Sequence, residues 1–201
     1  MVIGVLALQG AFIEHEDAMH RLGADTVQLR NANDLKKHLD GLILPGGEST
    51  VQGKLLRELN MFDPIKEMIT QGLPVLATCA GMILLAEKLE NDDTVHLGTM
   101  PICVKRNAYG RQLGSFQTID EMTGIGKIPM TFIRAPYVSE AGALVQVLAT
   151  VKDKIVGVQY KNQIAVAFHP ELDIDSNENS LEVHKYFNQL CKVNLTDQFQ
   201  L

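Results

Sequence analysis

The first half of the chain alternates short apolar runs with amphipathic stretches. Residues 2–8 are almost wholly apolar, which is the pattern of a strand buried on both faces of a parallel sheet. Residues 11–22 then carry apolar side chains at helical spacing, with acidic ones elsewhere. The alternation continues with expected strands at 26–29, 41–44 and 75–77 and expected helices at 34–39, 50–59, 63–72 and 80–86. Such alternation predicts a mostly parallel sheet with helices on both faces.

The second half changes character, because its apolar runs are separated by glycine-rich turns rather than by helical patterns. Strands are expected at 102–105, 117–119, 131–133, 144–151, 155–160 and 164–168. We interpret them as an antiparallel extension of the first sheet. A last helix is expected at 179–191, with a frayed tail after Lys192. No linker divides the chain, so we expect one α/β domain over residues 1–201 with an open mixed sheet in three layers.

The composition limits the kinds of molecule that this protein is expected to bind. The 201 residues are 46% hydrophobic and 21% charged, and the formal net charge of -6 comes without a Lys/Arg cluster, which argues against nucleic acid. No apolar run reaches membrane-spanning length and the first residues lack a signal-peptide pattern, so we expect a cytoplasmic protein without membrane contact. Three cysteines without CxxC spacing favour a reducing compartment and no metal site. No cofactor is expected.

Cys79 lies where an expected strand passes directly into an expected helix. Only Thr78-Cys79-Ala80-Gly81 separates the two, and the small residues Ala77, Ala80 and Gly81 allow a sharp turn there. A strand–turn–helix of this kind is a nucleophile elbow, here with cysteine at its apex. The amide end of the following helix favours thiolate over thiol. The alternative is a buried structural cysteine, because cysteine is among the most buried residue types.

His169 is the strongest candidate for the base that such a nucleophile needs. In Phe168-His169-Pro170-Glu171, an extended backbone would put His169 and Glu171 on one face, and Pro170 favours that extension. A carboxylate beside the imidazole would complete a Cys-His-Glu triad. The alternative is a strand-end histidine paired with a nearby acid, and His184 is the next candidate base. The remaining histidines, together with His184, are expected to face solvent: His15, His20, His38 and His96.

Two glycines at another strand end offer hydrogen-bond donors for an oxyanion. In Pro45-Gly46-Gly47-Glu48-Ser49, the backbone can turn its N–H groups toward a ligand, and the Ala80 N–H would be the second donor. The alternative is an ordinary tight turn into a helix. Gln9-Gly10, Gly46-Gly47 and Cys79 all follow strands, so we expect them on the same rim of the sheet.

Arg106 and Arg134 each follow an expected strand in the second half. A guanidinium fork matches the geometry of a carboxylate, so either residue could hold a substrate acid group. The alternative for each is a solvated or salt-bridged surface side chain.

These segments together resemble the class I glutamine amidotransferases, and more narrowly the glutaminase subunits of pyridoxal 5'-phosphate synthases. The resemblance covers nearly the whole chain, and each motif is weak alone but the ordered set is specific. The motifs are Ala7-Leu8-Gln9-Gly10, Leu44-Pro-Gly-Gly-Glu-Ser-Thr50, Thr78-Cys-Ala-Gly81, Arg106-Asn107 with Gly110-Arg111-Gln112, Ile133-Arg-Ala-Pro136 and Phe168-His-Pro-Glu-Leu172. The resemblance implies a flavodoxin-like fold and release of ammonia from L-glutamine to a synthase subunit that builds pyridoxal 5'-phosphate (vitamin B6).

The resemblance also implies a role for each site residue. Cys79 would be the nucleophile, with His169 and Glu171 completing the triad and a glutamyl thioester as the intermediate. Glutamine would be held by Gly46, Gly47, Glu48, Arg106, Ile133 and Arg134, with Gly47 and Ala80 forming the oxyanion hole. The sequence departs from the family at Ala77, where elbows usually carry glycine, and at the acidic pair Asp173 and Asp175. Two other classes remain open: an elbow-cysteine hydrolase or chaperone-like protein, and an inactive regulatory subunit.

Overall fold

A ten-stranded mixed sheet runs through the molecule, in the order β2-β1-β3-β4-β12-β11-β9-β6-β5 with β10 paired to β11. The computed structural model describes residues 1–106, 115–172, 174 and 179–198. The parallel strands are β1 (Val2–Leu6), β2 (Asp25–Leu29), β3 (Gly41–Leu44), β4 (Val75–Thr78) and β12 (Gln163–Val166). The extension is β5 (Ala86–Leu89), β6 (Met100–Lys105), β9 (Tyr137–Ala141), β10 (Gln146–Val151) and β11 (Lys154–Tyr160).

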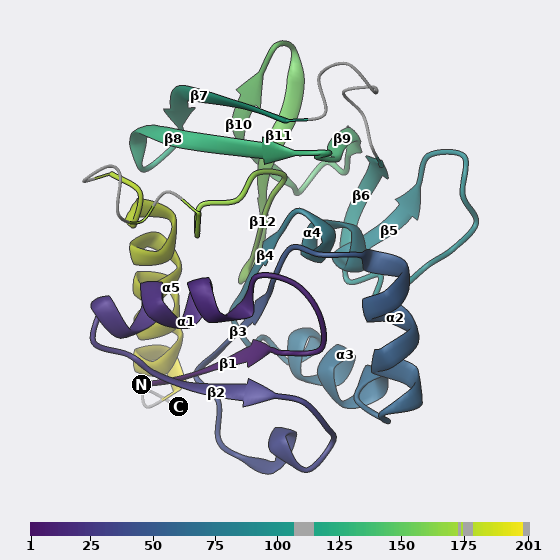
Figure 1. Cartoon of the computed structure of the whole chain (residues 1–201), viewed down its shortest axis with the longest axis vertical. Helices are drawn as coiled ribbons and strands as arrows, with labels where there is room; N and C mark the ends of the chain where they lie inside the picture. The colour runs from purple at the N-terminus through teal and green to yellow at the C-terminus, as the bar shows by residue number, and fades with distance from the viewer. Residues whose placement is uncertain (107–114, 173, 175–178, 199–201) are drawn as a thin grey trace.

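Antiparallel pairing begins where β12 meets β11 and continues through β9 to β6, which confirms the expected extension. A separate antiparallel hairpin, β7 (Ser115–Met122) and β8 (Gly126–Ile133), lies over this end of the molecule (Figure 1). It contains the strands expected at 117–119 and 131–133, whose assignment to the extension was therefore wrong, because among the described residues they pair only with each other. Both the parallel half and the fold class are therefore as the sequence predicted.

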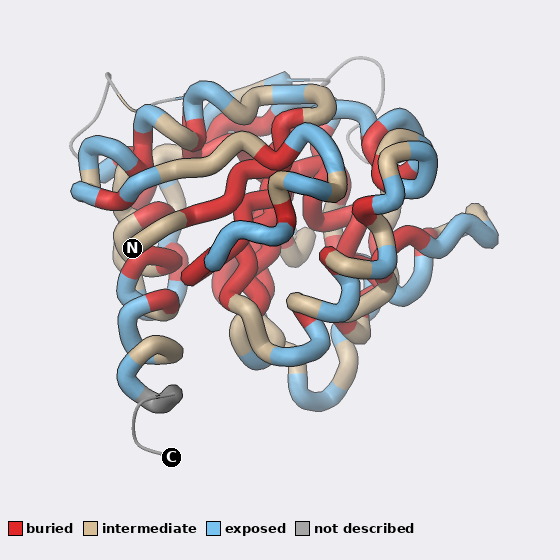
Figure 2. Tube along the Cα trace, turned by 90° about the horizontal axis from the view of Figure 1, so that it is seen from below, coloured by how far each residue is buried: buried red, intermediate tan, exposed pale blue. Residues whose placement is uncertain are grey.

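Helices cover both faces of the parallel strands (Figure 1). On one face lie α1 (Phe12–Arg21) and α5 (Glu182–Gln198), and on the other α2 (Ser49–Glu58), α3 (Phe62–Thr70) and the short α4 (Ala80–Leu85). A 3-10 turn, Asp34–Lys36, takes the place of the longer helix expected at 34–39. Buried residues follow the central strands, while the helices alternate buried and exposed positions (Figure 2). This is the three-layer burial that the alternating pattern predicts.

Three further expectations about the helices and strands were wrong. The helix after Cys79 ends at Leu85, and Ala86–Leu89 forms strand β5 because its backbone pairs with β6. Strand β9 was missed, since its second half is exposed and carries no alternating pattern. Helix α5 continues past Lys192 to Gln198, and Asn194 Oδ1 accepts a 3.1 Å hydrogen bond from Asn162 Nδ2, which ties this end to the β11–β12 turn.

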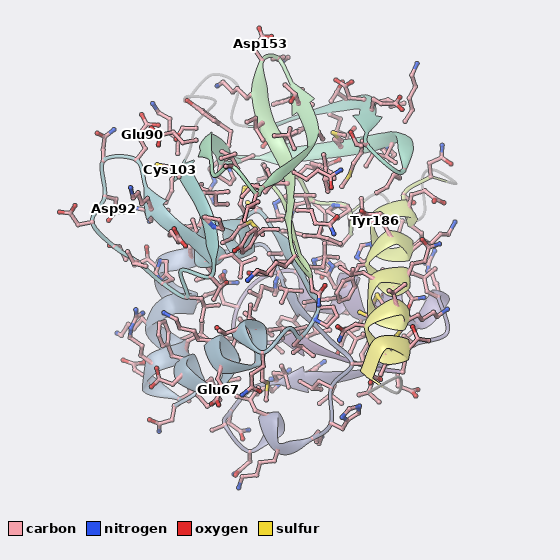
Figure 3. All side chains as sticks on the ribbon, turned by 180° about the vertical axis from the view of Figure 1, so that it is seen from behind. Glu67, Glu90, Asp92, Cys103, Asp153 and Tyr186 are labelled. Atoms are coloured by element: carbon pink, nitrogen blue, oxygen red, sulfur yellow. The ribbon has the colours of Figure 1, made fainter. Side chains whose placement is uncertain are left out.

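Helix α5 packs directly against the start of β3. Phe187 and Cys191 are fully buried, and a Cβ at Gly41 would lie only 2.6 Å from Cys191 Sγ and 2.9 Å from Phe187 Cζ. From the position next to Phe187, the Tyr186 hydroxyl donates a 2.7 Å hydrogen bond to Gln159 Oε1 on β11 (Figure 3). The helix is thus fixed at β3, at β11 and at the β11–β12 turn by close packing and side-chain hydrogen bonds.

We expect Phe187→Ala to lower the free energy of unfolding by about 3–5 kcal/mol, because it leaves a cavity between α5 and β3. Val193→Ala on the same helix is the control: Val193 is 56% exposed, so its truncation should change stability by about 0.5 kcal/mol or less. Urea titrations followed by circular dichroism would measure both variants. Equal midpoints for wild type and Phe187→Ala would contradict this account of α5.

Candidate active site

Cys79 occupies a strained turn between β4 and α4. Its backbone has φ 47° and ψ −101°, a left-handed φ that costs a non-glycine residue about 1–3 kcal/mol. The Cys79 N–H donates to the Val166 carbonyl at 2.8 Å, and its own carbonyl accepts from Met82 N at 3.1 Å. The neighbouring Ala77 pairs in regular register with both adjacent strands, so the departure from glycine there distorts nothing in the sheet. The backbone geometry is that of the expected elbow.

His169 and Glu171 are paired, although not for the reason that the sequence suggested. Strand β12 ends at Val166, and residues 169–172 form a turn in which Leu172 N donates to the His169 carbonyl at 3.4 Å. The expected extension of that strand to residue 168 was therefore wrong. The turn brings His169 Nδ1 to 2.7 Å from Glu171 Oε1, with the two residues 7% and 2% exposed.

Gly46 permits the close approach of His169 to Cys79. A Cβ at position 46 would lie 2.4 Å from His169 Cε1 and 3.4 Å from Cys79 Cβ, so only glycine fits there. Burial alone lowers the pKa of His169, but hydrogen bonds with the Cys79 thiol and the Glu171 carboxylate raise that pKa to about 10. The imidazole therefore holds its proton at neutral pH, between a sulfur and a carboxylate.

Side chains from two elements fix the loop that follows β3. Gln52, fully buried in α2, donates from Nε2 to the carbonyls of Gln9 at 2.9 Å and Pro45 at 3.2 Å. Gln9 in turn accepts the Glu48 N–H on Oε1 at 2.7 Å. Because Ala11 N also donates to the Gly46 carbonyl, the loops after β1 and β3 are joined on the rim beside Cys79, as expected.

Two backbone donors near Cys79 remain available. The Gly46 N–H is used, since it donates to Thr78 Oγ1 at 2.9 Å. The N–H groups of Gly47 and Ala80 have no acceptor within the described part of the chain. Both residues line the same small cavity as Cys79, of about 220 Å³, below the roughly 300–1,000 Å³ of sites for drug-sized ligands. This cavity suits a ligand of amino-acid size.

The remaining residues proposed from the sequence also line this cavity, except Gly46, which packs against His169. They are Glu48, Arg106, Ile133 and Arg134. The acidic pair Asp173 and Asp175 lies outside the described residues, as does the part of the arginine motif at 107–112.

The two arginines in the cavity wall differ in how far they are already paired. Arg106 Nη2 lies 2.7 Å from Asp92 Oδ2, on the loop after β5 (Figure 3), and its Nη1 donates to Thr50 Oγ1 at 3.3 Å. Arg134 Nη2 approaches Glu48 Oε1 only to 3.8 Å, with side chains 73% and 60% exposed, so this ion pair is weak. Arg134 is therefore the freer cation for a ligand.

Three histidines expected in solvent are buried: His15, His96 and His184. His15 and His184 contact each other under the site, at 2.9 Å between Nδ1 and Nε2. A sequence signal for both existed in the helical spacing. His15 falls three residues after Phe12 and four before Met19 on the apolar face of α1, and His184 falls three before Phe187.

Within 1–106, 115–172, 174 and 179–198, no group of three or more His, Cys, Asp or Glu side chains is placed to hold a metal ion. No helix in those ranges is both long and apolar enough to cross a membrane.

Comparison with known proteins gives consistent matches over nearly the whole chain. Residues 5–193 match the SNO glutamine amidotransferase family. A pyridoxal 5'-phosphate synthase subunit PdxT of Desulfitobacterium hafniense (strain Y51) is 62% identical over 87% of this chain and 88% of that protein. The subunit of the same name from Haemophilus influenzae (strain PittGG) is 56% identical over 96% of this chain and 100% of that protein. A solved glutamine amidotransferase structure superposes with a TM-score of 0.88, at 40% identity over 96% of this chain and 100% of that one.

We expect iodoacetamide to alkylate Cys79 about tenfold more slowly in His169→Asn than in wild type at pH 7. Because its pKa is raised to about 10, His169 is protonated at pH 7, and its positive charge stabilises the Cys79 thiolate. Asparagine carries no such charge. Alkylation rates come from mass spectrometry of the Cys79 peptide.

The other two cysteines are internal references. Cys103 is half-buried on β6, so its rate should be the same in both proteins. Cys191 should stay unmodified, because burial raises its pKa to about 12. Equal Cys79 rates in the two proteins would show that His169 does not activate the thiol.

Proposed function

The chain belongs to the SNO glutamine amidotransferase family, and from that we propose that it hydrolyses L-glutamine to L-glutamate and ammonia. The observation that carries the proposal is Cys79 on a strained elbow, in one cavity with two free backbone donors and beside His169, whose Nδ1 lies 2.7 Å from Glu171. We propose that residues 1–201 act as one glutaminase domain.

The first half of the reaction forms a thioester. The Cys79 thiolate attacks the side-chain carboxamide carbon of glutamine, and the N–H groups of Gly47 and Ala80 receive the charge that develops on its oxygen. As the carbon–nitrogen bond breaks, protonated His169 gives its proton to the leaving nitrogen, which departs as ammonia. The product is a glutamyl thioester on Cys79.

The second half of the reaction releases glutamate. His169, now neutral, takes a proton from a water molecule as its oxygen attacks the thioester carbon. The carbon–sulfur bond then breaks, which releases glutamate and returns the Cys79 thiolate beside protonated His169. The same two N–H groups serve the second oxyanion. Glu171 keeps the imidazole oriented and stabilises its charged form in both halves, so its carboxylate needs no proton of its own.

Substrate selection follows from the charges at the cavity mouth. Glutamine carries an α-carboxylate and an α-ammonium group. When the weak ion pair between Arg134 and Glu48 opens, Arg134 can bind the carboxylate and Glu48 can bind the ammonium group. Arg106 is held against Asp92 and adds positive charge to the cavity wall, and Ile133 provides an apolar surface.

We propose that the ammonia passes to the synthase subunit of a pyridoxal 5'-phosphate synthase, in the cytoplasm. Two relatives at 56–62% identity carry the name of such a subunit, and three free cysteines suit a reducing compartment. Ammonia released to water at neutral pH is mostly protonated and no longer nucleophilic. A direct transfer between subunits would keep it reactive.

We expect Cys79→Ala to abolish glutamate release, with a loss on the order of 10⁴ or more in kcat, and His169→Asn to cost about as much, because members of a triad act as a unit. Glu171→Gln should cost less, since it keeps an acceptor for His169 but loses the charge. Cys103→Ala is the matched control and should retain full activity. Glutamate is measured by a coupled dehydrogenase assay, and normal turnover by Cys79→Ala would refute the mechanism.

Activity should also depend on the synthase subunit. Gly47 has φ +154° and its Cβ position lies 2.3 Å from Gln9 Oε1. We propose that a partner docked on this rim moves Gln9 and thereby turns the unbonded Gly47 N–H toward the oxyanion. Because one oxyanion donor is worth about 10²–10³ in kcat, we expect activation of that order on adding the subunit.

Gly47→Ala should blunt this activation more than it weakens docking. Glutamate release titrated against the synthase subunit, beside a calorimetric binding isotherm on the same samples, separates the two effects. Full activity without the subunit would exclude the switch, and tight docking with no glutamate release by wild type would favour an inactive regulatory subunit instead.

A further inference from the structure

Two buried histidines lie directly behind the Cys79 site. His15 comes from α1 and His184 from α5, the two helices that cover one face of the sheet (Figure 1), and both are fully buried. His15 Nδ1 lies 2.9 Å from His184 Nε2. The other ring nitrogen, His15 Nε2, lies 3.2 Å from Thr78 Oγ1 and 3.5 Å from Glu171 Oε2. Through His15, the pair therefore contacts Thr78, which precedes the nucleophile, and approaches the Glu171 carboxylate of the proposed triad.

The Glu171 carboxylate is satisfied on one side only. Its Oε1 is held by His169, while Oε2 is buried and has no hydrogen-bond partner among the residues that the structure describes. A buried anionic oxygen without a donor is costly, and the nitrogen at 3.5 Å is His15 Nε2. A small rotation of either side chain would turn this approach into a hydrogen bond.

The surrounding oxygens define the tautomer of His15. Nε2 faces two oxygens, one of them a carboxylate that can only accept, so the proton belongs on Nε2. Nδ1 must then accept, and its donor is the N–H at Nε2 of His184. His184 Nδ1 then carries no proton. This agrees with its surroundings, because Nδ1 is buried and no acceptor lies within reach of it in the described structure.

We propose that His15 is a positioning residue for Glu171, with its Nε2–H directed at Oε2 and Thr78 Oγ1 and its tautomer set by His184. In this arrangement His15 and His169 hold the two carboxylate oxygens from opposite sides. The inference rests on the proposed glutaminase function, since it assigns a supporting role within that site. Outer residues that orient a catalytic group in this way commonly affect activity by about 10- to 100-fold.

The charge state of His15 is what makes the arrangement work. Burial, followed by the positive charges that His184 and His169 would carry, keeps the pKa of His15 well below its ordinary value of 6.5, and burial lowers that of His184 to about 4. The pKa of His169, on the same carboxylate, is instead raised to about 10. Glu171 therefore stabilises one imidazolium and receives only a neutral donor from the other side.

The first test compares kcat and KM for variants at position 15, on the full chain with saturating synthase subunit. His15→Leu removes the donor and should lower kcat on the order of tenfold, with KM for glutamine changed less than about twofold. His15→Gln places an amide N–H near the ring Nε2 and should restore kcat to within about threefold of wild type. His20→Gln, on the exposed side of α1, is the control and should match wild type.

A double-mutant cycle with Glu171→Gln separates positioning from general structural damage. If His15 acts through Glu171, His15→Leu should change kcat less than about twofold once Glu171 is glutamine. An equal loss in both backgrounds would overturn the proposal, as would a His15→Gln variant as impaired as His15→Leu. Melting temperatures of all variants check the fold.

Two further readouts keep the result interpretable. If His15→Leu does not fold, His184→Leu takes its place in the cycle, because it removes the donor that sets the His15 tautomer. If wild type releases no glutamate, the proposed function fails, but the iodoacetamide rate of Cys79 still tests the inference. That rate should fall at least threefold in His15→Leu and stay unchanged in His20→Gln, and an unchanged rate in His15→Leu would refute the positioning role.

Discussion

The left-handed backbone of Cys79 is the constraint on which the site depends. A non-glycine residue stays at φ 47° only where its surroundings over-determine it, and here β4 lies between β3 and β12 in the fully buried centre of the sheet. The ladder continues into the turn, since the Cys79 N–H bonds to Val166 on β12. The residues after β3 and β12 reach the same place, which is why Gly46 and His169 meet Cys79 there. Strain at one residue is thus supported by the most stable part of the fold.

One carboxylate organises the charges around that turn. Glu171 is almost fully buried and lies beside two imidazoles whose pKa values are shifted in opposite directions. His169 can compensate the carboxylate with a proton because Cys79 lies on its other side. His15 meets the same carboxylate only at 3.5 Å, its nearer partners are a neutral histidine and a hydroxyl, and burial keeps it uncharged. The difference between the two rings comes from their partners, since both are buried.

Local patterns in the sequence were enough for the parallel half of the fold and for the Cys79 elbow. Apolar runs followed by helical spacing are local signals, and so is a strand that passes into a helix through small residues. Strand β9 was missed because its pairing with β6 and β11 is the only signal for it. The pairing of His169 and Glu171 was predicted from strand alternation, whereas a turn produces it. His15 and His184 were predicted to face solvent because their polar residue type was given more weight than their helical spacing from apolar residues. Their partners become visible only when α1 packs against α5.

The position of these two helices links folding to the site. Helix α1 follows the first strand and α5 is the last element, so the His15–His184 contact joins residues 169 positions apart in the chain. Without α5, which packs onto β3 through Phe187, His15 would lose the His184 donor that sets its tautomer. Hydration of the His15 ring would also weaken the lowering of its pKa, because burial is the largest cause of that shift. The charge distribution behind Cys79 therefore depends on α5, whereas the elbow itself depends on β12, whose Val166 accepts the Cys79 N–H.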